Sequence, residues 1–379
     1  MYRKIMGFLE AWKENEHRKP LILQGARQVG KTYSILEFGR IHYENVAYFN
    51  FETNPKLNET FEEKISPDYL IPILSHIAGQ TIVKEKTLIV FDEVQLCERA
   101  LTSLKYFCED APDYHIIVAG SLLGVAVNRA KFSFPVGTVD MKTLYPMDME
   151  EFMIAVGEDE LVEQIKKCFE TNRPMPSALH DAAMQLYRQY LVVGGMPECV
   201  MQFVQTGDYI LIRHTQDTIL TSYLNDMGKY NNLNEIKKTR LAYDNITVQL
   251  SKKNTRFQYK LIKKGGRASE FENAIEWLCL SGIASQVYRV EQIKKPLENY
   301  RDIDAFKIYV SDLGLLCAKK DLAANDILYM VEELNDFKGG MTENYVNVQL
   351  AINGYNTYYW ESERGLSLIH ISEPTRLAL

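Results

Sequence analysis

The sequence lacks the patterns that mark several common classes of protein. No stretch approaches the 18 apolar residues of a membrane-spanning helix, and the apolar run Ile5–Leu9 is too short for the core of a signal peptide. The six cysteines lie at least eleven residues apart, and no two histidines have the spacing that places metal ligands on one helix face. We therefore expect a cytoplasmic protein with free thiols, no zinc site and no membrane partner.

The composition that remains is that of an ordinary globular protein. Its 379 residues are 46% apolar and 25% charged, and a chain of this length favours two or three compact domains. The net charge of −7 is unevenly distributed. Ser251–Arg267 contains seven Lys or Arg and no acid, which leaves 36 basic and 50 acidic residues elsewhere, a balance of −14. A basic segment therefore interrupts an acidic protein.

The first part of the chain alternates short apolar segments with helical patterns. Segments of this kind are typical of buried strands. They occur at Pro20–Gln24, Val46–Phe51, Thr87–Phe91 and His115–Ala119, and helical patterns such as Ala100–Glu109 lie between them. The alternation predicts an α/β fold, a parallel sheet with helices on both faces.

Helical patterns dominate the middle of the chain. They predict a helical lid and connector over 156–232. Within 233–300, the last predicted helix starts at Ser269. Glu272, three residues later, completes the spacing of a capping box. A strand pattern at Ile283–Val290 follows this helix. Helices followed by a strand, after a basic segment, indicate a winged-helix-like domain.

Gly25–Thr32 follows the first expected strand and has the pattern Gly-x-x-x-x-Gly-Lys-Thr. A glycine turn and the start of a helix offer many backbone N–H groups to phosphates, Lys31 would neutralise the β- and γ-phosphate oxygens, and Thr32 would bind Mg²⁺. A chance turn has this pattern in roughly one chain in a hundred of this length, and the strand before it and the helix after it make chance rarer still. We predict that ATP and Mg²⁺ are bound here. The phosphate-binding residues are Gly25, Ala26, Arg27, Gln28, Val29, Gly30, Lys31 and Thr32.

A later apolar strand ends in the acidic pair Asp92 and Glu93. Asp92 would hold the magnesium ion, usually through a water, and Glu93 would accept a proton from the attacking water or orient it. In isolation such a pair is often only a solvated turn, but here it follows a phosphate-loop pattern. The adjacent Glu and the extra strand at Val46–Phe51 favour NTPases that activate water over nucleotide kinases and GTPases. The acidic strand is expected not to neighbour the phosphate-loop strand.

The next expected strand ends at Gly120, and Ser121 could sense the γ-phosphate from there. An ordinary strand-end turn is the alternative. The surrounding residues do not match the Gly-x-Ser-x-Gly elbow of serine hydrolases. Lys31, Glu93 and Ser121 form the predicted catalytic set. Arg129 is the nearest arginine that could stabilise the transition state, although most surface arginines are simply solvated.

As a set, these motifs resemble the prokaryotic AAA-type ATPases that carry a C-terminal domain of unknown function with a restriction-endonuclease-like core. The resemblance covers nearly all of Met1–Gly365. It rests on Gly25–Thr32, Phe91–Gln95, Ala119–Ser121, Pro135–Gly137 with Pro146 and Glu151–Phe152, Gly194–Pro197, Ser311–Leu315, and Glu343–Val346 with Tyr359–Trp360.

The resemblance implies an ATPase that forms ADP and phosphate, with an AAA-type P-loop domain over 1–155 and a truncated restriction-endonuclease-like domain over 301–365. Between these lie the helical lid and the winged-helix-like domain. Glu343 matches the first acid of the nuclease-like core, whereas the later Asp and Glu-x-Lys would lie beyond Gly365. Thr138 stands where relatives often have an arginine, which argues against a phosphate-sensing role at that position.

Leu366–Arg376 reads as the translation of a common transposase-based sequencing adapter. We expect 366–379 to be an artefact of sequence assembly and the natural protein to continue beyond Gly365, so this segment is not expected to belong to the fold. Resequencing the locus without that library chemistry tests the expectation, which an unchanged tail would contradict.

The basic segment is a candidate surface for double-stranded DNA, because a local excess of cations without acids attracts phosphates. Phe257 and Tyr259 are interleaved with the cations. A solvated helix face is the alternative, as for most runs of charge. The candidate DNA-binding residues are Lys252, Lys253, Arg256, Lys260, Lys263, Lys264 and Arg267.

Three functions share the same predicted ATP site. The first is an ATPase that remodels DNA or protein, and the second is a nucleotide-operated, DNA-binding switch with slow turnover that responds to ATP by self-association. The third is an ATP-regulated nuclease in the untruncated protein. The sequence does not decide among them.

Overall fold

The computed structural model of the chain describes residues 1–125, 137–229, 233–250, 256–361 and 367–371. It divides into two compact units, of which the first is Arg3–Leu144. The second contains Met1–Tyr2 and the chain from Tyr145 onward. No helix of the described residues is long and apolar enough to cross a membrane. The finer division into four domains stays a prediction.

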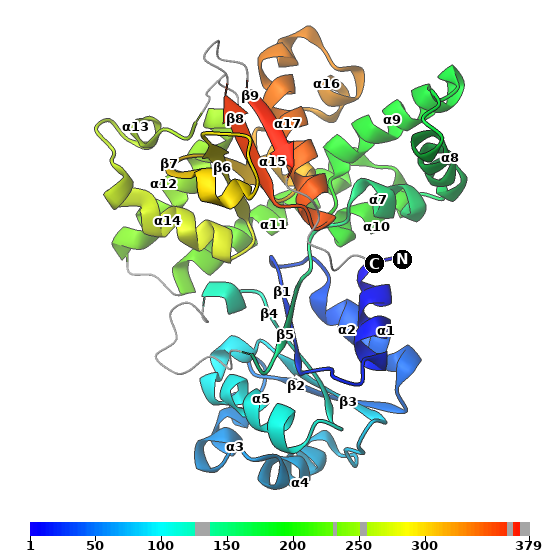
Figure 1. Cartoon of the computed structure of the whole chain (residues 1–379), viewed down its shortest axis with the longest axis vertical. Coiled ribbons are helices and arrows are strands. Elements are labelled where there is room, and N and C mark those ends of the chain that lie inside the picture. Colours follow the sequence, from blue (N-terminus) through cyan, green and yellow to red (C-terminus); the bar gives the residue numbers. More distant parts are fainter. Residues whose placement is uncertain (126–136, 230–232, 251–255, 362–366, 372–379) are drawn as a thin grey trace. The chain divides into compact units, whose positions relative to one another are not determined.

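The first unit contains a five-stranded parallel sheet with the order β2-β3-β4-β1-β5 (Figure 1). The predicted parallel sheet is therefore confirmed, and β4 separates the acidic strand β3 from the phosphate-loop strand β1, as expected. The edge strand β5 was not expected, because three of its four residues are polar and none of them is buried. The strands are β1 (Leu21–Gln24), β2 (Asn45–Asn50), β3 (Thr87–Asp92), β4 (His115–Gly120) and β5 (Asp140–Thr143).

Two groups of helices flank this sheet (Figure 1). The first group is α1 (Ile5–Glu14) and α2 (Lys31–His42), and α2 contacts three of the strands. The second is α3 (Leu57–Glu63), α4 (Pro67–Ala78) and α5 (Glu98–Asp110), preceded by the short 3₁₀ helix η1 (Val94–Leu96). Buried aromatic residues fill the core between this second group and the sheet, because apolar side chains from both meet there.

Helices make up most of the second unit, as the sequence predicts. Those before residue 230 are α7 (Met149–Ala155), α8 (Asp159–Glu170), α9 (Ser177–Val193), α10 (Pro197–Thr206) and α11 (Tyr209–Lys229). The later ones are α12 (Leu233–Leu250), α13 (Tyr259–Ile262), α14 (Ala268–Leu280), η2 (Leu297–Tyr300), α15 (Leu313–Lys319), α16 (Ala324–Tyr329), η3 (Glu332–Leu334) and α17 (Asn335–Ile352).

The capping box predicted for the start of α14 is wrong. The helix begins at Ala268, its N-cap is Arg267, and no side chain of the described residues caps it, so Ser269 lies inside the first turn. A capping box does occur at α7, where Asp148 and Glu151 exchange hydrogen bonds with each other's backbone N–H. The same spacing thus caps one helix and not the other, because the N-cap of α14 is Arg267, two residues before Ser269.

The second unit also contains a four-stranded mixed sheet with the order β7-β6-β8-β9. The strands are β6 (Ala284–Val290), β7 (Arg301–Val310), β8 (Thr357–Glu361) and β9 (Ser367–Ile371). Strands β6 and β7 pair antiparallel, and β8 is parallel to β6. The winged-helix-like domain stays a prediction, although α12, α14 and the β6–β7 pair follow its expected order. Strand β9 lies within 366–379, whose adapter origin also stays a prediction.

Candidate active site

The turn between β1 and α2 has a backbone that only a glycine-rich sequence adopts easily. Gly25 has a φ of 148°, Gly30 has a φ of 91°, and Gln28 between them has a φ of 66°. A Cβ atom at Gly25 would lie 2.1 Å from the carbonyl oxygen of Leu144, which follows β5. Glycine is therefore required at Gly25 both for its conformation and for the close approach of the neighbouring backbone.

Lys31 bends back over this turn from the first residue of α2. Its side chain is buried, and its Nζ donates hydrogen bonds of 2.8 Å to the carbonyl oxygens of Gly25 and Ala26. Arg3, which is also buried, donates from Nη1 to the carbonyl oxygen of Val29 at 3.0 Å. Two cationic side chains thus hold the turn and add positive potential where phosphates are predicted to bind.

Thr32 and Asp92 bring the start of α2 and the end of β3 together across β4. The Thr32 hydroxyl donates to Oδ2 of Asp92 at 2.8 Å, and Asp92 is only 5% exposed. Tyr48 on β2 donates to the same Oδ2 at 2.7 Å, and the Asn50 amide donates to the Tyr48 hydroxyl at 3.1 Å. Burial raises the pKa of Tyr48 to about 12, so its hydroxyl remains a donor at neutral pH.

These oxygen atoms fit a magnesium ion. Mg²⁺ prefers hard oxygen ligands and is usually bound by one or two protein oxygens together with substrate phosphates and waters. Thr32 and Asp92 would hold the ion, which would neutralise charge on the phosphates. The described residues contain no cluster of three or more His, Cys, Asp or Glu that could hold a metal without such help.

Glu93 has a conformation that sets it apart from Asp92. Its φ is 52°, in the left-handed region, and its carboxylate accepts a hydrogen bond from Nε2 of Gln95 in η1. Burial raises the pKa of Glu93 above its ordinary value, and the hydrogen bond from Gln95 opposes this change. A carboxylate with a raised pKa is a stronger base, as activation of water requires.

Ser121 lies at the same edge of the sheet. Gln24 of β1 pairs with Gly120 of β4, so the residues that follow, Gly25 and Ser121, leave neighbouring strands at the same level. Ser121 is buried. Its role as a γ-phosphate sensor stays a prediction, and the predicted candidate Arg129 lies outside the described residues.

Sequence reasoning missed the roles of Arg3, Tyr48, Asn50 and Gln95 in this site. Tyr48 and Asn50 lie on one face of β2 near its carboxyl end, which was a usable signal once β2 was known to neighbour β3. That neighbour relationship cannot be read from the sequence alone.

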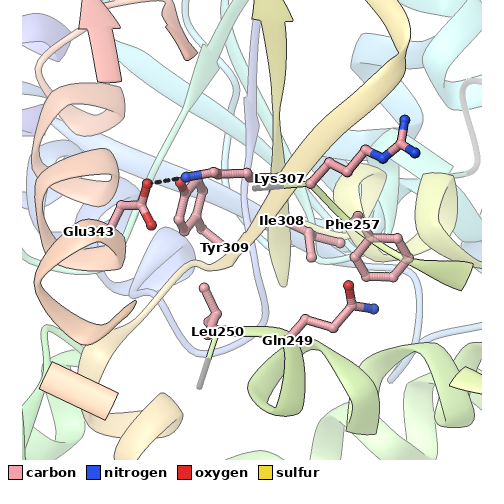
Figure 2. Close-up of a pocket in the computed structure, with 8 residues that line it drawn as sticks. Gln249, Leu250, Phe257, Lys307, Ile308, Tyr309 and Glu343 are labelled. Carbon is pink, nitrogen blue, oxygen red and sulfur yellow. Dashed lines mark hydrogen bonds and ion pairs between the residues drawn. The ribbon is translucent and has the colours of Figure 1, made fainter. Parts of the chain in front are cut away.

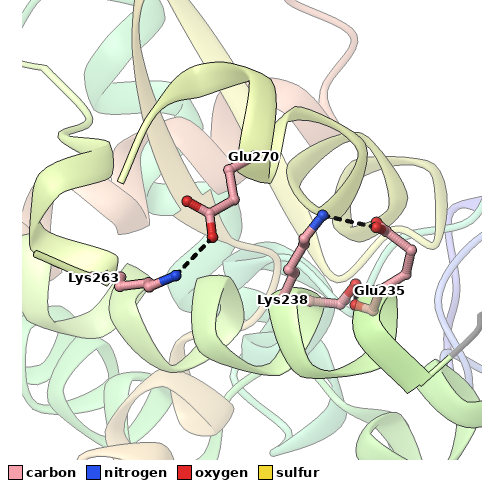
Figure 3. Close-up of polar contacts among 5 residues, drawn as sticks. Glu235, Lys238, Lys263 and Glu270 are labelled. Carbon is pink, nitrogen blue, oxygen red and sulfur yellow. Dashed lines mark hydrogen bonds and ion pairs between the residues drawn. The ribbon is translucent and has the colours of Figure 1, made fainter. Parts of the chain in front are cut away.

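The structure describes five of the seven candidate DNA-binding residues, and all five are exposed. Lys252 and Lys253 lie outside the described residues. Lys263 forms an ion pair with Glu270 of α14, with Nζ 3.1 Å from Oε1 (Figure 3). The exposed residues are Arg256, Lys260, Lys263, Lys264 and Arg267.

The interleaved aromatic residues face the interior of the second unit. Phe257 is buried and stacks on Phe306, with ring centroids 5.3 Å apart, and Tyr259 contacts both rings edge to face. These two side chains anchor the basic segment to β7 and are occupied by that packing. The cations of the basic segment are therefore accessible to a partner, whereas Phe257 and Tyr259 pack against Phe306.

Glu343, the acid matched to the nuclease-like core, lines a cavity of about 30 Å³ in the second unit (Figure 2). Its carboxylate is paired with the ammonium group of Lys307 on β7. Burial raises the pKa of Tyr309 beside them well above its ordinary value. The cavity is lined by Gln249, Leu250, Arg256, Phe257, Lys307, Ile308, Tyr309 and Glu343.

The comparisons with known proteins agree with this architecture. Residues 17–153 match the model of the AAA domain family, and residues 184–326 match a model named Domain of unknown function (DUF8612). The Walker-type ATPase PABY2304 of Pyrococcus abyssi is similar over 84% of this chain and 95% of its own, with 14% identity and a TM-score of 0.51. A search of curated proteins found no match.

Two further solved structures are more distant. The ORC2 protein of Aeropyrum pernix has 11% identity and a TM-score of 0.40, over 92% of this chain and 95% of its own. A variant of RuvB from Thermotoga maritima has 14% identity and a TM-score of 0.35, over 76% of this chain and 88% of its own.

The parallel sheet with its strand order, the glycine turn before α2 and the flanking helices together define a P-loop NTPase fold. Within that class, the first unit is an AAA-type P-loop ATPase domain, and the chain joins it to a domain of unknown function.

Proposed function

We propose that the protein binds ATP with Mg²⁺ at the turn Gly25–Thr32 and hydrolyses it to ADP and phosphate. The observation that carries this proposal is the partly buried hydrogen bond between Thr32 and Asp92, 2.8 Å between hydroxyl and carboxylate oxygen. It joins the phosphate loop to the acidic strand although 60 residues separate them in the chain. A structural turn without a ligand would not require a carboxylate at that position.

Each side chain of the site has a separate role in the proposed binding and hydrolysis of ATP. In the proposed complex, Lys31 exchanges its backbone carbonyl partners for the β- and γ-phosphate oxygens, and Thr32 and Asp92 hold the metal. Glu93 accepts the proton of the attacking water, while Ser121 contacts the γ-phosphate from the end of β4. Backbone N–H groups of the turn bind the remaining phosphate oxygens.

Two substitutions test this assignment. Lys31→Ala should abolish binding of Mg-ATP, measured by titration calorimetry, because it removes the cation that balances the phosphates. Glu93→Gln should retain that binding and stop phosphate release, because an amide cannot accept the proton. Parental turnover in Glu93→Gln would show that Glu93 is not the base, and the absence of magnesium-dependent triphosphate binding in the parent would reject the proposal as a whole.

A DNA-binding role of the second unit is the second candidate. It is supported by the exposed cations of the basic segment, of which Lys260, Lys264 and Arg267 lie on or beside α13 and α14. These helices precede a pair of antiparallel strands, an arrangement that suits a winged helix on duplex DNA. We extend the proposal to double-stranded DNA on this basis.

The rate of ATP turnover distinguishes the three functions that the site permits. Fast turnover stimulated by DNA would favour a remodelling ATPase. Slow turnover that DNA does not change, together with ATP-dependent self-association in sedimentation measurements, would favour a switch. DNA cleavage by a version extended beyond Gly365, lost on Glu343→Gln, would favour a nuclease.

A further inference from the structure

Gln95 connects the acidic pair to the strand that precedes Ser121. From η1, its Nε2 donates a hydrogen bond to the Glu93 carboxylate, and the side chain is 8% exposed. The amide orientation is defined by this contact, because the opposite orientation would place two oxygen atoms against each other. The Nε2 group of Gln95 therefore holds the Glu93 carboxylate, and the amide cannot be reversed without losing this hydrogen bond.

The other end of the same amide packs on Gly120. Oε1 of Gln95 is buried and has no hydrogen-bond partner among the residues that the structure describes. A Cβ atom at Gly120 would lie only 2.0 Å from this oxygen, so no residue other than glycine leaves room for the amide. A buried polar group without a partner is unfavourable. A side chain that served packing alone would be better replaced by an apolar one at this position.

The backbone of Glu93 leads to the same interpretation. Its φ of 52° lies in the left-handed region, which non-glycine residues adopt rarely. The direction of the carboxylate is thus restrained twice, by its own backbone and by Gln95. Neither restraint is needed for Asp92, which Thr32 and Tyr48 hold.

We propose that Gln95 is a positioning residue for Glu93, and that Gly120 is a glycine so that the Gln95 amide fits between Glu93 and the end of β4. This inference rests on the proposed role of Glu93 as the base. It adds that one side chain contacts both the base and the end of β4, next to Ser121.

Gln95→Met tests the hydrogen bond, because methionine has the same length and no amide. Turnover at saturating Mg-ATP should fall on the order of tenfold, as for other groups that orient a functional side chain, with the dissociation constant of Mg-ATP within about twofold of the parent. The expected result is therefore a loss of turnover without a loss of Mg-ATP affinity, because the phosphate-binding turn does not contain Gln95. A merely structural role would lower turnover and Mg-ATP affinity together.

Gly120→Ala tests the packing, since the added methyl group displaces the same amide. It should lower turnover in the same way, and Gln95→Met combined with Gly120→Ala should be no slower than the slower single variant, because both act through one contact. Gly7→Ala on α1 is the matched control, because a Cβ atom there meets no atom of the described residues within 4 Å. Its turnover should equal that of the parent.

The outcomes separate this inference from the proposed function. Parental turnover in Gln95→Met, with parental ATPase activity established, would overturn the positioning role alone. A parent without Mg-ATP turnover would overturn the function itself. If Gln95→Met does not fold, as judged by its thermal melt, Gln95→Asn replaces it, because the amide is retained but is too short to reach both contacts. Turnover of Gln95→Asn equal to the parent would then overturn the inference.

Discussion

Asp312 accepts a hydrogen bond of 2.6 Å from the backbone N–H of Gly195, although 117 residues separate them in the chain. The same carboxylate caps α15 through the N–H of Leu315 at 2.9 Å. A Cβ atom at Gly194 would lie 2.3 Å from Oδ1 of Asp312, so the turn requires a glycine. The motifs Gly194–Pro197 and Ser311–Leu315, distant in sequence, therefore meet around one buried carboxylate.

Asp312→Asn should destabilise the second unit by about 1–3 kcal/mol, because an amide NH₂ group would face backbone N–H donors. The carboxylate also makes stability depend on pH. Burial raises the pKa of Asp312 to about 6, above its ordinary value of 3.8, although backbone hydrogen bonds oppose the change. The folded state thus binds the proton more tightly than the unfolded chain, so ionisation of Asp312 lowers the stability of the parent as pH rises from about 4 to 6, while its hydrogen bonds to the backbone remain.

Urea unfolding of the second unit at pH 4 and pH 7 measures both effects. The variant Asp312→Asn should lose this component of the pH dependence. Asp181→Asn is the control, because the Asp181 side chain is 82% exposed. Equal stability of Asp312→Asn and the parent at pH 7 would contradict the role of this carboxylate as the link between the two motifs.

Tyr48→Phe should raise the Mg²⁺ concentration required for ATP binding. The substitution removes the 2.7 Å hydrogen bond to Asp92 and retains the ring, so the carboxylate loses one of the groups that orient it. Groups that orient metal ligands typically contribute about 10–100-fold to metal affinity, and we expect a change near the lower end. A fluorescent ATP analogue titrated at graded Mg²⁺ concentrations measures it.

Tyr69→Phe is the matched control for this experiment. It removes a comparable hydrogen bond, 2.6 Å from the Tyr69 hydroxyl to Glu63, in an exposed part of the same unit. An identical Mg²⁺ requirement in Tyr48→Phe and Tyr69→Phe would exclude an effect of Tyr48 on the metal site.

His115 should make the first unit sensitive to acid. It is buried, its Nδ1 lies 2.7 Å from the Tyr43 hydroxyl, and burial together with the positive charge of Arg18 and Lys13 lowers its pKa to about 4. An unfolded histidine has a pKa of about 6.5 and takes up the proton first. Stability is therefore lost as pH falls from about 6.5 to 4.

Thermal unfolding of the first unit between pH 4 and pH 7 measures this dependence. His115→Gln should flatten the curve, because glutamine does not titrate. His17→Gln, at an exposed histidine, should leave the parental curve unchanged. A parental pH dependence in His115→Gln would assign the acid sensitivity to other groups.

Reversing charge in the basic segment should weaken DNA binding. Replacing Lys260 and Lys264 by Glu removes two exposed cations. The negative slope of log affinity against log salt should become shallower by about 1 for each phosphate that the protein no longer neutralises. Fluorescence anisotropy with a labelled duplex at graded salt measures both quantities. Lys105→Glu, on the exposed face of α5, is the control. No duplex affinity at low salt, or affinity insensitive to salt and to these changes, would reject the DNA proposal.

Much of the first unit could be predicted because each of its motifs is a run of neighbouring residues in the chain. The strands β1 to β4 are short apolar runs, and the residues of Gly25–Thr32 define a phosphate-binding turn by their types and spacing alone. The acidic pair at the end of β3 was also visible. By contrast, β5 escaped prediction because an exposed edge strand needs no apolar pattern, and the start of α14 depends on the backbone before it.

The sequence by itself determined the phosphate loop and the acidic pair, since each is a run of neighbouring residues whose chemistry does not depend on distant partners. Only the tertiary structure decided what holds them. Tyr48 reaches Asp92 because β2 lies beside β3, and Gln95 rests on Gly120 because η1 packs against β4. Such contacts depend on which strands become neighbours when both faces of the sheet are buried, and no local pattern records that choice.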